Sequence, residues 1–379
     1  MNTANATSFC ASAVRPKAIV VVAVALAALA GLGADGVVTR VGAVNWDCSV
    51  PSYTFFGKAA TSSLGPEKFR DRTPYYAHAV GKDKIEYRYR TLAEYEQEMR
   101  YAIDAGIDYF AYCWYDLIPQ KPVAEGFAAK ADGHLQEITK ARLNHVKSPL
   151  RDKLHLCAIL VSVHAYSNEE LLSLALEMRE PWYEKVGERP LVYMFHRISD
   201  ELPRLRDICR QVGAGDPYAV LMGGRPHVPE IASQVEALGA YAYSGNGADF
   251  AEFTARSIAS NAKRAGIGKP VIPHFATGWD PTPRIDNPVP WGNYPAGRPY
   301  RAAKTRDDFL HGARELSRWI GANAKSCPTG HVLAFAWNEF EEGGWICPTL
   351  GKDGKPDTWR IEAFRAAVDV LKGRSGQTP

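Results

Sequence analysis

The chain has 379 residues, of which 46% are hydrophobic and 23% are charged. This composition excludes extensive disorder, because there is enough apolar surface to offset the entropy lost on folding. Lysine and arginine number 45 against 42 aspartates and glutamates, for a net charge of +3, which argues against a dedicated nucleic-acid-binding protein.

The N-terminal 34 residues have the pattern of a targeting segment. Arg15 and Lys17 precede an uncharged apolar run at 18–32. A short basic region followed by about 15 apolar residues is typical of a secretory signal peptide, whereas a membrane-spanning helix needs about 20. We therefore expect residues 1–34 to direct export to the periplasm or the extracellular space. The alternative is an uncleaved anchor in the inner membrane, which would be the only membrane contact.

Glycines at the end of this segment imitate a cofactor motif. Gly31, Gly33 and Gly36 spell G-x-G-x-x-G, but a dinucleotide site needs a strand before the motif and a helix after it. The residues that follow, 37–46, are β-like. We therefore predict no cofactor.

Six of the seven cysteines lie beyond residue 34. An even number permits disulfides in an exported chain. Cys327 and Cys347 flank one predicted strand and could pair, whereas Cys113 and Cys157 lie inside apolar strands and are expected to be buried thiols. The sequence contains no C-x-x-C, so it does not support a zinc ribbon.

Eight β-rich segments alternate with helical segments over residues 35–379. Several strands are apolar throughout, which is typical of a parallel sheet buried on both faces. The pattern predicts a single-domain (β/α)8 TIM barrel, with a doubly wound open sheet as the alternative. The predicted strands are 41–46, 108–114, 154–163, 190–195, 218–222, 239–243, 270–275 and 330–337. The predicted helices are 91–105, 124–145, 167–185, 200–212, 229–238, 249–265, 305–324 and 359–371.

Two long loops follow the first and seventh predicted strands. Residues 276–304 contain six prolines and two tryptophans, and residues 48–90 are rich in Tyr, Phe and Pro. Loops of this length in a compact domain usually serve function.

The active site of a barrel lies at the carboxyl ends of its strands, so residues after each strand are candidates. Polar and aromatic side chains are concentrated there, and 11% of the chain is aromatic. Such rings stack on flat ligands, which suits a carbohydrate. The candidate substrate-binding residues are Trp46, Asp47, Trp114, Tyr115, His164, Tyr243, His274, Trp279, Asp280, Arg284, Asn338 and Trp345.

Three glutamates, Glu339, Glu341 and Glu342, follow the last strand. Like charges this close raise the pKa of at least one of them. A protonated carboxyl beside an ionised one is the pair that glycosidic cleavage uses. A turn after the strand would aim Glu339 and Glu342 into the mouth of the barrel, and we predict that they are catalytic. A solvated acidic loop and a Mg²⁺ or Ca²⁺ site are the alternatives; we predict no metal.

Three segments carry a family resemblance. Residues 336–343 (AWNEFEEG) resemble the N-E-W-x-E-G motif of glycoside hydrolase family 99 and the related WbsX-like proteins. Residues 278–284 (GWDPTPR) and 105–115 (AGIDYFAYCWY) resemble two further segments of WbsX-like chains. The resemblance implies a (β/α)8 fold and a retaining, metal-independent endo-α-mannosidase or mannanase activity. It further implies that Glu339 is the base toward the sugar 2-hydroxyl, giving a 1,2-anhydro intermediate, and that Glu342 is the general acid and then the base.

The chain departs from that pattern at three places. Glu341 stands where the family usually has His or Gly, and Cys347-Pro348 replaces a further glutamate. The opening strand ends in Asn45-Trp46-Asp47 in place of Tyr-Tyr-x-Pro. These departures leave the sugar specificity open.

The sequence therefore predicts an exported glycoside hydrolase that cleaves α-linked, mannan-like polysaccharide or oligosaccharide. A glycosyltransferase or envelope-polysaccharide assembly protein is one alternative, and a non-catalytic carbohydrate-binding barrel is another. The expected partner is a carbohydrate, and no nucleic acid is expected.

Overall fold

A computed structural model describes residues 36–46, 50–115, 137–161, 165–198 and 200–374. The expected targeting segment, the candidates Asp47 and His164, Cys48 and the first part of the expected helix 124–145 lie outside the described residues. None of the helices in the described ranges is long and apolar enough to span a membrane.

Eight parallel strands form a barrel, which confirms the predicted (β/α)8 fold. The ring closes where Leu238 forms a parallel bridge with Val271, and the Leu238 amide donates to the Pro270 carbonyl at 2.9 Å. A short strand, β6 (Lys185–Val186), adds to β7 in antiparallel direction. The barrel strands are β1 (Arg40–Asn45), β4 (Tyr109–Tyr115), β5 (His155–Val161), β7 (Arg189–Phe195), β8 (Tyr218–Met222), β9 (Ala237–Gly239), β10 (His274–Ala276) and β13 (His331–Phe335).

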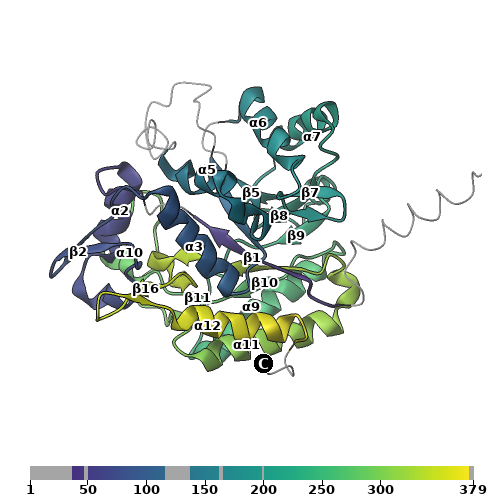
Figure 1. Cartoon of the computed structure of the whole chain (residues 1–379). Coiled ribbons are helices and arrows are strands. Elements are labelled where there is room, and N and C mark those ends of the chain that lie inside the picture. The colour runs from purple at the N-terminus through teal and green to yellow at the C-terminus, as the bar shows by residue number, and fades with distance from the viewer. Residues whose placement is uncertain (1–35, 47–49, 116–136, 162–164, 199, 375–379) are drawn as a thin grey trace, which may run out of the picture.

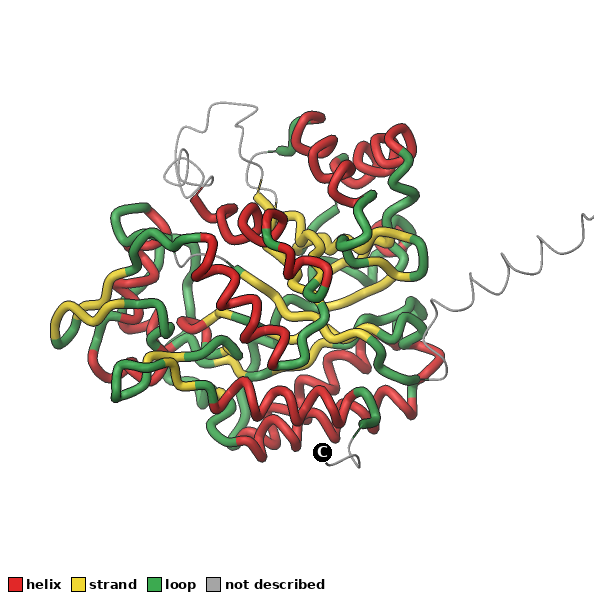
Figure 2. The backbone as a smooth tube through the Cα atoms, in the orientation of Figure 1, coloured by secondary structure: helices red, strands yellow, loops and turns green. Residues whose placement is uncertain are grey.

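Helices surround the strands, as Figures 1 and 2 show. The α3 helix begins where expected, because Thr91 accepts from the Glu94 amide and Glu94 bonds back to Thr91 in a capping box. The helices are α3 (Leu92–Asp104), α5 (Lys140–Lys147), α6 (Asn168–Met178), α7 (Glu201–Val212), α8 (Pro229–Ala232), α9 (Phe250–Ala265), α11 (Arg306–Ala322) and α12 (Trp359–Leu371). Single 3₁₀ turns are η2 (Glu137–Thr139), η3 (Pro149–Asp152) and η4 (Ala324–Ser326).

Several predicted boundaries were wrong, including that of the expected strand 270–275, which begins at His274. The expected helix 167–185 ends at Met178, shortly before Pro181, which is a residue that does not continue a helix. The expected helix 229–238 ends at Ala232, because residues 237–239 form β9. The expected strand 239–243 accordingly stops at Gly239, and Tyr241 and Tyr243 lie beyond the strand.

Cys327 and Cys347, whose pairing the sequence left open, do not form a disulfide. Both are buried free thiols. They lie at opposite ends of the five-residue strand β13, which spans roughly 16 Å at about 3.3 Å per residue. A disulfide needs Cα atoms within about 7 Å. Cys113 and Cys157 are buried free thiols, as expected.

The loops at the carboxyl ends of β1, β10 and β13 carry additional elements. Helix α10 contacts both α2 and the turn η5, and in Figure 1 α2 and α10 lie together at the left. These loops therefore build one layer over the end of the barrel. After β1 come α2 (Phe55–Leu64), η1 (Glu67–Arg72), β2 (His78–Gly81) and β3 (Lys84–Glu86); after β10 come β11 (Gly278–Trp279), α10 (Thr282–Asp286) and β12 (Arg301–Ala302); after β13 come β14 (Asn338–Glu339), η5 (Phe340–Glu342), β15 (Gly344–Trp345), β16 (Thr349–Leu350) and β17 (Pro356–Asp357).

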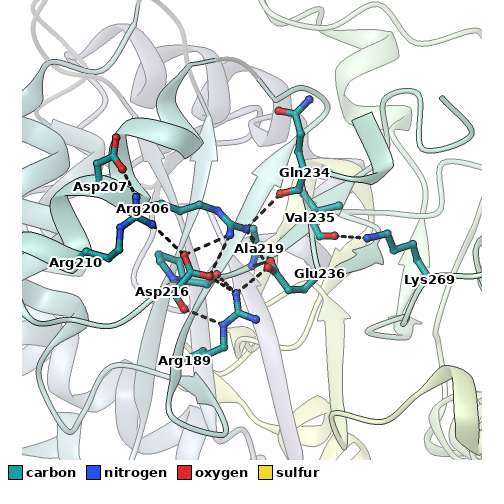
Figure 3. Close-up of polar contacts among 11 residues, drawn as sticks. Arg189, Arg206, Asp207, Arg210, Asp216, Ala219, Gln234, Val235, Glu236 and Lys269 are labelled. Carbon is teal, nitrogen blue, oxygen red and sulfur yellow. Dashed lines mark hydrogen bonds and ion pairs between the residues drawn. The ribbon is translucent and has the colours of Figure 1, made fainter. Parts of the chain in front are cut away.

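Charged side chains tie together the amino ends of β7, β8 and β9 (Figure 3). Arg189 donates to Asp216 and to Glu236, each at 2.7 Å, and Arg206 bonds both of the same carboxylates. Glu236 also accepts from the Ala219 amide at 2.8 Å. Two carboxylates thus meet two guanidinium groups at this end of the barrel, which lies opposite to the end that carries the active site in TIM barrels, so these contacts stabilise the fold.

A second ionic cluster lies at the amino ends of β1, β5 and β13. Glu184 accepts from Arg40 Nε at 2.8 Å, and it contacts His155 at 3.0 Å and His331 at 2.9 Å. Burial alone would raise the pKa of Glu184, but the hydrogen bonds from the two histidines and Arg40 outweigh burial and hold that pKa well below its ordinary value.

Candidate active site

A tight hairpin after β13 positions the three glutamates. Glu339 ends β14, which pairs with β15, and the 3₁₀ turn η5 joins the two strands. The turn closes on Gly343, whose φ is +76° and where a Cβ would lie 2.6 Å from the Asp280 amide nitrogen. Only glycine fits this position without strain. The Asp280 amide donates to the Glu342 carbonyl at 2.6 Å, so the hairpin is fixed to the loop after β10.

Glu339 and Glu342 line one cavity of about 240 Å³ at the carboxyl end of the barrel. This volume is slightly below the ~300–1,000 Å³ of typical small-molecule pockets, so the enclosed space suits a single ring-sized group. The other residues that line it are Trp46, Phe56, Cys113, Tyr115, Val161, Phe195, Tyr241, Arg284, Trp291 and Tyr294. Most of the lining is aromatic, and Arg284 is its one cation among the described residues.

Arg284 is shared by all three glutamates. Its guanidinium donates to Glu342 and lies 3.4 Å from Glu339 Oε2 and 3.7 Å from Glu341 Oε2. Burial would lower the pKa of Arg284, but the three carboxylates raise it well above its ordinary value. One cation facing three buried carboxylates cannot neutralise them all, so the cluster favours protonation of at least one glutamate.

Burial and a neighbouring carboxylate favour the protonated form of Glu339. Its side chain is buried, and burial together with the negative charge of Glu342 raises the pKa of Glu339 well above its ordinary value, against the opposing effects of Arg284 and Tyr241. The Tyr241 hydroxyl donates to Glu339 Oε1 at 2.5 Å. Burial also raises the pKa of Glu341, more than Arg284 lowers it.

Glu342 lies closer to Arg284 than Glu339 does, within the same cavity. Its Oε1 accepts from Arg284 and from the Tyr294 hydroxyl, the latter at 2.7 Å. A charged donor and a phenol on one oxygen stabilise the ionised carboxylate. Burial and the charge of Glu342 keep Tyr294 itself protonated by raising its pKa. The site therefore holds a buried carboxyl whose pKa is raised, Glu339, beside a carboxyl that accepts from a guanidinium and a phenol, Glu342.

An aromatic wall completes the cavity. The Trp46 indole donates to the Tyr115 hydroxyl at 2.6 Å, and the Trp46 and Trp291 rings meet edge to face with centroids 5.5 Å apart. The Arg284 guanidinium lies 5.0 Å from the Trp46 ring centroid. Rings fixed in this way present the apolar faces on which sugar C–H groups stack.

The structure brings three of the predicted substrate-binding residues to the cavity: Trp46, Tyr115 and Arg284. Asn338 lies next to the cavity and supports it, because its Oδ1 accepts from the Trp46 amide at 2.9 Å. Trp279 packs against the cavity residue Tyr294 with ring centroids 6.2 Å apart.

Asp280 is turned away from the cavity. Its carboxylate bonds Arg72 and the Thr282 hydroxyl, and burial, which would raise its pKa, is outweighed by Arg72, so that the pKa lies below its ordinary value. Its contribution to the site is the amide that holds Glu342.

Four predicted residues lie elsewhere, which corrects the sequence analysis. Trp114 points outward to α5, where Arg142 lies 3.7 Å from its ring centroid. His274 faces Ser257 of α9 at 3.4 Å, and burial lowers its pKa to about 3. Tyr243 packs on Phe253 of α9, and Trp345 lies on the far side of the hairpin beside Arg360. Side chains alternate between the two faces of a strand, so ending a strand does not by itself bring a residue to the lumen.

Sequence reasoning missed several cavity residues, of which Tyr241 and Tyr294 bond the glutamates directly. Tyr294 and Trp291 lie in the long loop 276–304, whose two tryptophans the sequence analysis noted without predicting Trp291 or Tyr294 to bind substrate. Alternation along β4 offered a signal for Cys113, because Cys113 and Tyr115 share the face opposite to Trp114. Tyr241 gave no such signal, since it lies beyond the end of β9.

The described residues contain no group of three or more His, Cys, Asp or Glu side chains arranged to hold a metal ion. The three glutamates direct oxygens at Arg284 instead.

Comparison with solved structures supports the barrel fold. The chain is similar to a structure described as a glycoside hydrolase-like protein, with a TM-score of 0.54, 13% identity and coverage of 88% of this chain and 94% of that one. It is also similar to the GH99 endo-alpha-mannosidase of Bacteroides thetaiotaomicron, with a TM-score of 0.48, 13% identity and coverage of 80% and 86%. For that enzyme in complex with bis-tris-propane, the TM-score is 0.49 at 14% identity, with coverage of 89% and 99%. No protein-family model matches the sequence, and no curated protein matches it either.

Proposed function

We propose that the protein is a glycoside hydrolase that uses Glu339 and Glu342 as its catalytic pair. The observation that carries this proposal is the unequal environment of two carboxyl groups in one aromatic cavity. Glycosidic cleavage needs a proton for the leaving oxygen and a carboxylate that offsets or removes charge at the sugar. Glu339 supplies the first property and Glu342, held by Arg284 and Tyr294, supplies the second.

This assignment reverses the roles that the family resemblance implies. Glu339 donates its proton to the glycosidic oxygen as the bond from that oxygen to C1 breaks. Glu342 accepts the proton of the sugar 2-hydroxyl as the 2-oxygen closes on C1. Water then opens this ring, its proton returning to Glu339 while Glu342 returns the other proton to the 2-oxygen. Both glutamates end in their starting states, and the configuration at C1 is retained.

The substrate that we propose is an α-linked, mannan-like polysaccharide or oligosaccharide. The resemblance of residues 278–284 and 336–343 to family 99 and WbsX-like chains supports it. The basic and apolar pattern of residues 15–32 supports export. The pair needs no metal to transfer the two protons, so we expect turnover to persist in EDTA.

A turnover screen tests the reaction class. The wild type, Glu339→Gln and Glu342→Gln are incubated with α-mannans and other α-linked bacterial and fungal polysaccharides, with and without EDTA. We expect oligosaccharide release by the wild type and a loss of at least about 10³-fold in both variants. Glu362→Gln, an exposed glutamate on α12, is the matched control and should keep full activity.

An aryl glycoside with a good leaving group separates the two roles. Such a leaving group departs without protonation, so removal of the acid has little effect on it. We expect Glu339→Gln to lower kcat/KM on this substrate by no more than about tenfold, and Glu342→Gln to lower it as strongly as on polysaccharide. The opposite pattern would restore the roles that the resemblance implies.

Two other outcomes would overturn the proposal. Tight glycan binding that all three proteins retain, with no turnover of any substrate, would indicate a non-catalytic carbohydrate-binding barrel. Turnover that requires a nucleotide sugar and Mn²⁺ would indicate a glycosyltransferase.

A further inference from the structure

A second cavity lies outside the one that holds the glutamates. Its volume is about 600 Å³, within the range of pockets that hold small ligands. Segments from the loops after β1, β10 and β13 line it, together with the start of α12. The charged and aromatic residues among them are Arg70, Asp71, Arg72, Lys304, Trp345, Lys352, Asp357, Trp359 and Arg360.

Three residues that line this cavity carry buried N–H groups without an acceptor among the described residues. They are Arg70 Nη1, Arg360 Nη2 and Trp345 Nε1. Guanidinium and indole groups only donate hydrogen bonds. Buried donors are nearly always paired in proteins, and these three belong to residues that line one cavity, which favours a ligand that carries acceptors.

Arg360 is the most enclosed of the three. Its side chain is 2% exposed and lies 3.8 Å from the Trp345 ring centroid and 4.9 Å from that of Trp359. Its other nitrogens donate to the Trp345 and Ala303 carbonyls at 2.8 and 2.6 Å. No described carboxylate lies within ion-pair distance of it. Burial and the charge of Arg72 lower the pKa of Arg360 to about 9, so it remains a cation at neutral pH.

The charge around the cavity is positive. Five cations line it against two carboxylates, Asp71 and Asp357. Arg72 already has a carboxylate partner, Asp280. Lys304 and Lys352 are exposed and form no ion pair with a described residue. An anionic group would therefore find donors that have no competing partner.

We propose that this cavity binds an anionic substituent, a carboxylate or a sulfate ester, on a sugar residue of an acidic glycan. Carboxylate and sulfate oxygens accept several hydrogen bonds from guanidinium groups at once. Arg360 and Trp345 supply the buried donors, and Arg70 supplies a third at the side of η1.

The position of the cavity argues for a glycan over a free anion. Trp345 follows Glu342 by three residues in the same hairpin, and Arg72 bonds the Asp280 carboxylate while the Asp280 amide bonds the Glu342 carbonyl. The hairpin that carries the glutamates therefore contributes residues to the lining of both cavities. An acidic sugar held here would belong to the same chain as the sugar at the glutamates. This step rests on the proposed function and narrows its substrate to an acidic polysaccharide.

Calorimetric titration of the purified protein tests the binding. The probes are D-glucuronate, galactose 6-sulfate, neutral glucose and inorganic sulfate. We expect both anionic sugars to bind, binding to weaken with added salt, and glucose to bind at least about tenfold more weakly. Inorganic sulfate that binds as tightly as galactose 6-sulfate would overturn the assignment to a glycan. Glucose that binds as tightly as glucuronate would overturn the anion site altogether.

Variants locate the site. Arg70→Ala should weaken binding of the anionic sugars about tenfold. Arg70 also donates to two carbonyls of the hairpin β2–β3, so the double variant Lys304→Ala, Lys352→Ala, which changes only exposed side chains, provides a second test and should weaken binding about threefold. Arg318→Ala, an exposed arginine on α11, is the control. Binding unchanged in both the Arg70 and the lysine variants would overturn the proposal.

Glu342→Gln separates this proposal from the proposed function. We expect this variant to lose turnover and to bind glucuronate as the wild type does. If the wild type turns over no glycan while glucuronate binding depends on Arg70, the anion-binding proposal is supported and the hydrolase proposal is refuted. If the wild type and Arg70→Ala cleave an acidic glycan with the same KM, the hydrolase proposal is supported and the anion-binding proposal is refuted.

Discussion

Two buried glutamate clusters at opposite ends of the barrel differ in their balance of charge. At the amino ends of the strands, one carboxylate, Glu184, meets Arg40, His155 and His331. At the carboxyl ends, three carboxylates share Arg284. The pKa of Glu184 is lowered and that of Glu339 is raised, although burial raises both.

The comparison shows that burial does not decide the charge of a glutamate by itself. The number of donors per carboxylate decides it. An excess of donors makes Glu184 a fixed anion that joins β1, β5 and β13. A deficit of donors favours protonation in the cluster at the carboxyl ends of the strands. A proton held at a buried carboxyl is what an acid catalyst needs.

Replacement of Arg284 should have the largest effect on stability. Arg284→Met leaves three buried carboxyl groups without a cation, and we expect a loss of about 3–5 kcal/mol in the free energy of unfolding at pH 8. The raised pKa values mean that the folded protein binds more protons than the unfolded chain, so the loss should shrink as the pH falls toward 5. Urea unfolding at both pH values measures it, with Arg284→Lys as the charge-retaining control. A loss that does not change with pH would mean that the cluster is not short of positive charge.

Glu184→Gln should have the next largest effect, with the opposite dependence on pH. We expect a loss of about 3 kcal/mol at pH 7, because Arg40 and the two histidines lose their shared anion. Because the pKa of Glu184 is lower in the folded protein, its charge stabilises the fold fully above pH 4.5 and less below it. The difference in the free energy of unfolding between wild type and Glu184→Gln should therefore narrow as the pH falls below 4.5. The exposed Glu188, four residues along the chain, provides the control variant Glu188→Gln. A difference that widens in acid would refute the fixed charge of Glu184.

The sequence predicted the scaffold better than the site, for a physical reason. Apolar strands and capped helices are local features, so the barrel strands could be found within a few residues except near β9. The site residues depend on which face of a strand or loop a side chain occupies. Trp114 and Tyr115 are adjacent, yet Tyr115 lines the cavity and Trp114 packs under Arg142.

The glutamate pair could be singled out because three like charges in four positions are rarely stable without a reason. Their partners could not be paired with them from the sequence. Tyr241 and Tyr294 reach the glutamates from the ends of other βα units, at separations of 98 and 48 residues. Arg284 matched a motif, but nothing in that motif indicates that one guanidinium serves three carboxylates.

Replacement of Glu341 should have the smallest effect on stability. Glu341 is buried, and its pKa is raised chiefly by burial, although Arg284 lies 3.7 Å away. A raised folded pKa means that stability is complete below pH 4.5 and declines as the pH rises through the folded value. Glu341→Gln removes that decline. We therefore expect the free energy of unfolding to rise by about 1 kcal/mol at pH 8 and to stay unchanged near pH 4.

Thermal unfolding of wild type and Glu341→Gln at both pH values measures this gain, and Glu362→Gln should show none at either pH. A loss at pH 8 as large as that of Glu184→Gln would mean that Arg284 holds Glu341 ionised. The cluster around Arg284 would then resemble the one around Glu184, and only Glu339 would be left to hold the proton. A gain at pH 8 would mean that the third carboxylate lowers stability, and that its repulsion helps to keep the neighbouring Glu339 protonated.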